Sequence, residues 1–255
     1  MDPWMIADLD VAGLMQAPSR FEVWTRVIAE RRAETIAEVG VYRGGFAEAM
    51  LRDCPGITTY YMVDPWRHLE DWNKPANQPD DRFQAIFEKA MGRTAPWEAK
   101  RVVLRGRTTE VIDSIPDGSL DLAYIDADHT LRGISIDLIR VWEKVRPGGL
   151  LGGDDFTRSV WQHDQSFEPS LVFPFAVYFA EAVGSPVTAL AYNQFLIHKV
   201  DTGFAFHDPT GHYGDTTLRA ALAAGPRRRR RGWRSVPSAG RALARGLTHK
   251  LRHQG

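Results

Sequence analysis

Four acidic residues and a histidine follow two apolar runs in the middle of the chain. Asp126, Asp128 and His129 come directly after the run 120–125, and Asp154 and Asp155 come after a second, shorter run. Carboxylates and imidazoles can accept protons, and carboxylate oxygens are the ligands that Mg²⁺ prefers. Carboxylates that converge without a nearby lysine repel one another, and a divalent cation removes that cost. Residues 120–156 therefore predict a site for proton transfer and metal binding.

The pattern between these residues predicts how they are brought together. The run 120–125 has the length of a strand buried on both faces, and apolar residues at helical spacing follow in 134–145. Residues 146–149, with one proline and two glycines, read as the end of that helix. Two parallel strands joined by a right-handed helical crossover place both acidic ends at one edge of a sheet, where open α/β folds bind ligands.

A glycine-rich turn after residue 39 is the second region that predicts binding. A short buried strand, 35–39, leads into glycines at 40, 44 and 45, and a helical pattern follows. Glycine lets the backbone approach a ligand closely, as at the start of a nucleotide-binding α/β domain. The spacing differs from G-x-G-x-x-G, and Glu38 precedes the first glycine. A carboxylate at that position suits a cationic amino group and would repel a pyrophosphate.

The next strand, 57–63, ends in Asp64, which is placed to accept hydrogen bonds from ribose hydroxyls. A long polar loop, 65–82, follows it and contains Trp66 and Trp72. Loops of this length are often functional lids, but the two tryptophans could equally cover the edge of the core.

The remaining pattern predicts the fold class. A helix from Phe83, a strand at 101–104 and a helix capped by Thr108 or Thr109 precede the central stretch. A helix over 172–183 follows it, and strands at 186–191 and 194–200 lie too close together for a helical crossover. We therefore expect an α/β fold with a doubly wound, mostly parallel sheet whose last strand is antiparallel.

Composition divides the chain into a body and a tail. The 255 residues carry 32 basic and 32 acidic side chains, but residues 226–255 hold ten Lys and Arg and no Asp or Glu. The body is thus acidic, with a net charge of about −10, and the tail is basic. One cysteine, Cys54, excludes an intrachain disulfide, and together with the absence of a signal-peptide pattern it predicts a cytoplasmic location.

We expect four segments: an N-terminal helical segment (1–32), the main domain (33–200), an extension of the body (201–225) and the basic tail (226–255). Residues 1–18 could form a packed helix, a lid or a dimer arm, and the last would make the protein a homo-oligomer. The tail has Leu243, Leu247 and Leu251 on one helical face, which suits an anionic membrane surface, and disorder is the alternative. Nucleic acid is a poor partner for an acidic body.

Taken together, four motifs resemble those of class I S-adenosylmethionine-dependent methyltransferases. They are residues 38–44 (EVGVYRG), 63–66 (VDPW), 124–129 (YIDADH) and 147–155 (PGGLLGGDD). The resemblance is strongest to the macrocin- and novobiocin-type sugar O-methyltransferases, with catechol O-methyltransferase more distant. It implies a seven-stranded sheet in the order 3-2-1-4-5-7-6 and O-methylation of a hydroxyl on a sugar-containing or other small-molecule natural product.

The resemblance also implies roles for individual residues. S-adenosylmethionine would be bound by Glu38, Gly40, Tyr42, Gly44, Asp64, Arg107, Thr108 and Asp126. Mg²⁺ or another divalent cation would be held by Asp126, Asp154 and Asp155. Asp128 would take the proton from the acceptor hydroxyl, and His129 is the second candidate for this role because its ordinary pKa is nearer neutrality.

Two other functions share parts of this pattern. A nicotinamide-dependent oxidoreductase has a similar fold, but it requires G-x-G-x-x-G and has no use for three acids at the strand ends. A nucleic-acid-associated methyltransferase would use the basic tail, against the charge of the body.

Overall fold

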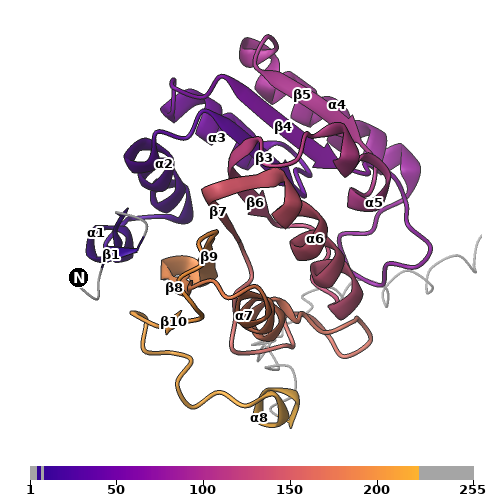
Figure 1. Cartoon of the computed structure of the whole chain (residues 1–255). Coiled ribbons are helices and arrows are strands. Elements are labelled where there is room, and N and C mark those ends of the chain that lie inside the picture. Colours follow the sequence, from indigo (N-terminus) through magenta and orange to yellow (C-terminus); the bar gives the residue numbers. More distant parts are fainter. Residues whose placement is uncertain (1–4, 7–8, 224–255) are drawn as a thin grey trace, which may run out of the picture.

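A sheet of eight strands forms the centre of the computed structural model, which describes residues 5–6 and 9–223 (Figure 1). The strands are β3 (Thr35–Val39), β4 (Thr59–Asp64), β5 (Arg101–Arg105), β6 (Leu120–Ile125), β7 (Val145–Gly153), β8 (Val187–Leu190), β9 (Gln194–His198) and β10 (Phe206–His207). They lie in the order β10-β8-β9-β7-β6-β3-β4-β5. From β5 to β8 this corresponds to 3-2-1-4-5-7-6 in the numbering of the seven expected strands, and β10 is an addition.

The sheet is parallel from β5 to β7 and changes direction at β9. β9 pairs antiparallel with both β7 and β8, as the short spacing between the last two predicted strands indicated. The connection from β8 to β9 is the single turn Ala191–Asn193, in which Tyr192 and Asn193 have positive φ values of 62° and 57°. β10 then pairs parallel with β8 at the sheet edge. The predicted hairpin is therefore confirmed.

Helices cover both faces of the sheet. One layer contains α1 (Val11–Met15), α2 (Arg20–Arg31), α3 (Gly45–Asp53) and α4 (Asp80–Thr94), and the other contains α5 (Thr108–Val111), α6 (Leu131–Lys144) and α7 (Val172–Ala182). Alternate strand residues point to the two layers: Ile36 and Leu122 pack with the first, and Ala37 and Ala123 with the second. Burial on both faces explains why the strands read as continuous apolar runs.

The remaining elements are short. They are β1 (Met5–Ile6), β2 (Leu9–Asp10), three single-turn helices at Ala95–Trp97, Ile112–Ser114 and Ala191–Asn193, and α8 (Leu218–Ala223). Within the described ranges, no helix combines the length and apolar character needed to span a membrane. The basic tail, 226–255, lies outside these ranges, so its predicted binding to anionic membranes stays a prediction.

Two local predictions are wrong. Helix α5 begins at Thr108 after Arg107, and the Thr108 hydroxyl donates to Asp137 Oδ1 at 2.5 Å, so neither threonine caps this helix. Residues 146–149 belong to β7, where the register with β6 shifts, because the chain turns directly from α6 into the strand at Val145. The helix stop signal and the strand start therefore coincide.

Candidate active site

One cavity of about 1200 Å³ opens at the carboxyl ends of β3, β4 and β6. Most of the predicted cofactor residues line it: Glu38, Gly40, Tyr42, Asp64, Arg107, Thr108 and Asp126. The cavity continues past Asp128, His129 and Asp155 to the loops at 65–79 and 157–169. The sheet topology thus brings the glycine turn and the acidic strand ends to one chamber, as open α/β folds do.

The glycine turn approaches the end of β6 so closely that a side chain does not fit. Gly40 has φ +96°, and a Cβ atom there would lie 2.1 Å from the backbone oxygen of Asp126. Gly44 has φ +71° and precedes α3, where its Cα side packs against Ala90. Gly44 does not line the cavity, so the structure places it in the turn and leaves its predicted cofactor contact untested.

Glu38 is buried beneath this turn and faces the cavity. Its Oε2 accepts a hydrogen bond of 2.8 Å from the Tyr60 hydroxyl. Burial raises the pKa of Glu38 well above its ordinary value, and the nearby charges of Asp126 and Asp64 raise this pKa further. A cationic group in the cavity would stabilise the ionised carboxylate, which is the chemistry expected for a ligand amino group.

Asp64 ends β4 with its carboxylate fixed by the backbone. Oδ2 accepts from the Tyr42 amide and Oδ1 from the Trp66 amide, both at 2.8 Å. Burial raises the pKa of Asp64 to about 6, although these hydrogen bonds favour the charged form. Each carboxylate oxygen can accept a further hydrogen bond, so Asp64 can still accept from vicinal hydroxyls.

Arg107 and Thr108 lie at the far wall of the cavity, but their polar groups already have partners. The Arg107 guanidinium donates to the carboxylate of Asp71, with Nη1 at 3.1 Å from Oδ2. The Thr108 hydroxyl is bound to Asp137, as described above. Their predicted position beside an adenine ring stays a prediction.

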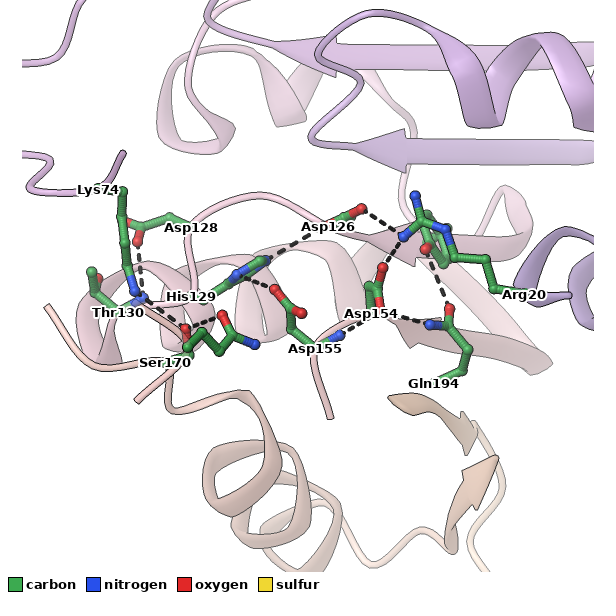
Figure 2. A network of polar contacts seen from close by, with 12 residues as sticks. Arg20, Lys74, Asp126, Asp128, His129, Thr130, Asp154, Asp155, Ser170 and Gln194 are labelled. Atoms are coloured by element: carbon green, nitrogen blue, oxygen red, sulfur yellow. Dashed lines mark hydrogen bonds and ion pairs between the residues drawn. The ribbon is translucent and has the colours of Figure 1, made fainter. Parts of the chain in front are cut away.

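At the ends of β6 and β7, Arg20 lies between two of the predicted metal ligands. Its Nη1 is 3.4 Å from Asp126 Oδ2 and also contacts Asp154 Oδ2 (Figure 2). The other oxygen of Asp154 accepts from Gln194 Nε2 at 2.6 Å and from the Asp155 amide at 2.8 Å. Asp154 is therefore enclosed by protein donors, and it does not line the cavity.

His129 lies between the other pair of acids. Its Nδ1 is 2.6 Å from Asp155 Oδ2, and its Nε2 is 3.5 Å from Asp126 Oδ1. Burial would lower the pKa of His129, but the hydrogen bonds and charges of Asp126 and Asp155 outweigh burial and raise it to about 9. His129 is thus a cation at neutral pH, and it is poorly suited to accept a proton there.

In the part of the chain that the structure describes, the candidate metal-binding group is Asp126, His129 and Asp155, whose ligand atoms lie within 4.8 Å of one another. Asp154, the third predicted ligand, is not in this group because its carboxylate faces Arg20 and Gln194. The predicted three-carboxylate donor set for Mg²⁺ is therefore not assembled. The sequence gave no indication that Arg20 would reach these acids.

Asp128 faces the cavity from the loop after β6. Its Oδ1 accepts from the Thr130 amide at 2.9 Å and from Trp72 Nε1 at 3.2 Å. Gly133 provides the space for this carboxylate, since a Cβ atom at Gly133 would lie 2.2 Å from Asp128 Oδ2. One oxygen is thus held in place, and Oδ2 is not used by these donors.

The two long loops join each other over the acceptor side of the cavity. The Asn73 amide group donates to the Ser166 carbonyl at 2.8 Å, and Lys74 Nζ donates to the Glu168 carbonyl at 2.7 Å. The tryptophans of the first loop have different roles. Trp66 is fully buried in the core, whereas Trp72 lines the cavity and contacts Asp128.

Comparison with known proteins agrees with this geometry. Residues 37–156 match a sequence family described as a methyltransferase domain. These residues include the glycine turn, Asp64 and the acids at the ends of β6 and β7. No curated protein matches the chain.

Several solved structures share the fold. An O-methyltransferase from Bacillus cereus in complex with SAH is 17% identical, with a TM-score of 0.50 and coverage of 73% of this chain and 84% of that chain. A protein from Staphylococcus aureus assigned as a caffeoyl-CoA O-methyltransferase is 13% identical, with a TM-score of 0.52 and coverage of 73% and 87%. The O-methyltransferase NovP is 14% identical, with a TM-score of 0.50 and coverage of 74% and 79%. At these identities the likeness establishes the fold.

Proposed function

We propose that this chain, whose residues 37–156 form a methyltransferase domain, transfers a methyl group from S-adenosylmethionine to a hydroxyl of a small molecule. The observation that carries this proposal is the single cavity in which Glu38 and Asp64 lie at one end and Asp128 at the other. The S-adenosylhomocysteine complex of the Bacillus cereus O-methyltransferase supports the choice of cofactor. A sugar-containing or other small natural product is the proposed acceptor, from the sequence resemblance.

The buried acids account for binding of the cofactor. Glu38 would accept hydrogen bonds from the amino group, whose positive charge offsets the cost of ionising this carboxylate. Asp64 would accept from the ribose hydroxyls while the Tyr42 and Trp66 amides hold it in place. The close approach of Gly40 to β6 leaves the floor of the cavity open for the ligand.

Asp128 is the proposed general base. In the reaction, the acceptor oxygen bonds to the methyl carbon, the bond from that carbon to sulfur breaks, and the hydroxyl proton passes to Asp128. Trp72 and Thr130 fix Oδ1, so Oδ2 has a defined direction toward the cavity. His129 is the weaker candidate because its raised pKa, about 9, keeps it protonated at neutral pH.

Divalent metal dependence is not carried into this proposal. The donor set predicted for Mg²⁺ lacks Asp154, which faces Arg20 and Gln194. The remaining group includes an imidazole, which suits Zn²⁺ or other transition metals better than Mg²⁺. We therefore derive the proton transfer from Asp128 alone.

The test is methyl transfer from radiolabelled S-adenosylmethionine to a panel of phenols, catechols and glycosides, followed by chromatography of the labelled products. We expect label in an ether-linked product of at least one hydroxyl compound. Label that enters only amines, thiols or nucleic acid would refute transfer to oxygen.

A further inference from the structure

Arg20 is carried to the acid-tipped strand ends by a firmly docked helix. It is the first residue of α2, whose N-terminus is capped by the Ser19 hydroxyl, which accepts from the Glu22 amide at 3.2 Å. Four residues further on, Trp24 is fully buried, and its Nε1 donates to Gln194 Oε1 at 2.8 Å. The position of Arg20 therefore follows from core packing.

The same helix also fixes the carboxylate that Arg20 contacts. Gln194 accepts from Trp24 through its oxygen and donates to Asp154 Oδ1 through its nitrogen at 2.6 Å. Asp154 Oδ2 then meets the Arg20 guanidinium. Figure 2 shows this arrangement, with Arg20 between Asp126 and Asp154 and Gln194 behind Asp154. Both residues of the ion pair are thus oriented from α2.

The charge of Arg20 is permanent, and it lies where the electrostatics call for a cation. Asp126 and Asp154 end neighbouring parallel strands, and two carboxylates at this separation repel each other in a partly buried site. A guanidinium has five N–H donors, and the printed contacts to both acids use only Nη1. Arg20 also lines the cavity, so its other donors can face a bound acceptor.

A divalent cation and Arg20 cannot both occupy this position. A metal ion that binds Asp126 and Asp154 together would have to lie in the space now taken by Nη1, against the like charge of the guanidinium. We propose that Arg20 takes the place of a divalent cation in this active site, holding Asp126 and Asp154 and directing N–H groups at the acceptor oxygen. This inference rests on the proposed methyl transfer.

Cation binding to the purified full chain tests the proposal without knowledge of the acceptor. Mn²⁺ binding, with Mg²⁺ as competitor, would be measured by electron paramagnetic resonance for the wild type, Arg20→Gln and Arg20→Lys. We expect Arg20→Gln to bind Mn²⁺ at least tenfold more tightly than the wild type, because the acids lose their internal cation. Arg20→Lys keeps a positive charge and should bind as weakly as the wild type.

Arg26→Gln is the matched control. Arg26 is on the same helix, where it pairs with Glu22 and donates to the Gly13 carbonyl, away from the strand ends. Its substitution should leave Mn²⁺ binding unchanged. Wild-type binding as tight as that of Arg20→Gln would overturn the proposal, and so would equally weak binding by the two proteins.

Cofactor binding separates this inference from the proposed function. S-adenosylmethionine affinity would be measured for the same variants by calorimetry in the presence of EDTA. Retained affinity in Arg20→Gln shows that this variant is folded, so its Mn²⁺ result can be interpreted. Failure of the wild type to bind S-adenosylmethionine would contradict the proposed function, whereas the Mn²⁺ comparison concerns Arg20 alone.

Discussion

The two ends of the cavity are built in different ways. At the cofactor end, Gly40, Glu38 and Asp64 come from two adjacent strands and the turn between them, and the backbone holds the ligand-facing groups. At the acceptor end, Asp126 and Asp154 are held by Arg20, which is 106 and 134 residues away in the sequence. The first end depends on local chain geometry, and the second depends on long-range side-chain pairing. Substitutions at the two ends should therefore affect different measurements.

Asp128→Asn should have the largest effect, and it should affect turnover alone. The amide cannot accept the hydroxyl proton, so we expect a loss of about a hundredfold or more in kcat. Affinity for S-adenosylmethionine should be nearly unchanged because Asp128 lies at the acceptor end. The measurement is label transfer together with cofactor calorimetry, and unchanged turnover would remove Asp128 as the base.

Gly40→Ala should have the opposite pattern, with cofactor binding lost first. The new Cβ would clash with the backbone oxygen of Asp126, and the φ of +96° is unfavourable for alanine. We expect S-adenosylmethionine affinity to fall by about tenfold or more, in line with a cost of roughly 1–3 kcal/mol for such backbone strain.

Gly118→Ala is the control for Gly40→Ala. Gly118 also has a positive φ, +63°, but no atom lies within 4 Å of a Cβ built there, and it is remote from the cavity. This variant should lose some stability and keep its cofactor affinity. Equal losses of affinity in both variants would show that strain, rather than the approach to β6, weakens binding.

His129 should make the acceptor end sensitive to alkaline pH. Its pKa is raised from 6.5 to about 9, so its stabilising contribution is fully present below pH 6.5 and is lost as the pH rises through 9. The shift corresponds to roughly 3 kcal/mol of unfolding free energy. Urea unfolding at pH 6 and pH 10 should show a larger loss for the wild type than for His129→Gln. The same loss in both proteins would contradict the pairing with Asp126 and Asp155.

Glu38→Gln should have the smallest effect of these changes. Because the pKa of Glu38 is raised, the ligand-free carboxyl holds a proton to a higher pH, and a cationic ligand should release that proton. Calorimetry of S-adenosylmethionine binding in two buffers with different ionisation enthalpies should detect proton release in the wild type and less in Glu38→Gln. We expect about a tenfold loss of affinity, which is about 1.4 kcal/mol.

The difference between the two ends also explains what the sequence could predict. The strands that end in Asp64 and Asp126, and the glycine turn between β3 and α3, follow from apolar runs and punctuating residues that are neighbours in sequence. Tyr60 as the partner of Glu38 could have been inferred, because it faces Glu38's side of the adjacent strand at a register that parallel pairing constrains.

The role of Arg20 could not be predicted in this way. It depends on how α2 packs against β9 through Trp24 and Gln194, and no local pattern fixes that contact. The separation of Asp154 from Asp155 has a similar cause. Adjacent residues after a strand point in different directions, and the positive φ of Asp155, 60°, turns its carboxylate toward His129. The edge strand β10 was missed because two residues are too few to form a pattern.

The central claim is that the cavity binds S-adenosylmethionine, and titration calorimetry with the wild-type chain in EDTA tests it most directly. The account predicts saturable binding of one molecule per chain, competition by S-adenosylhomocysteine and loss of affinity in Gly40→Ala. It also predicts no binding of NAD⁺, since Glu38 would lie against the pyrophosphate. Absence of heat with S-adenosylmethionine, or binding of NAD⁺ in its place, would contradict the account.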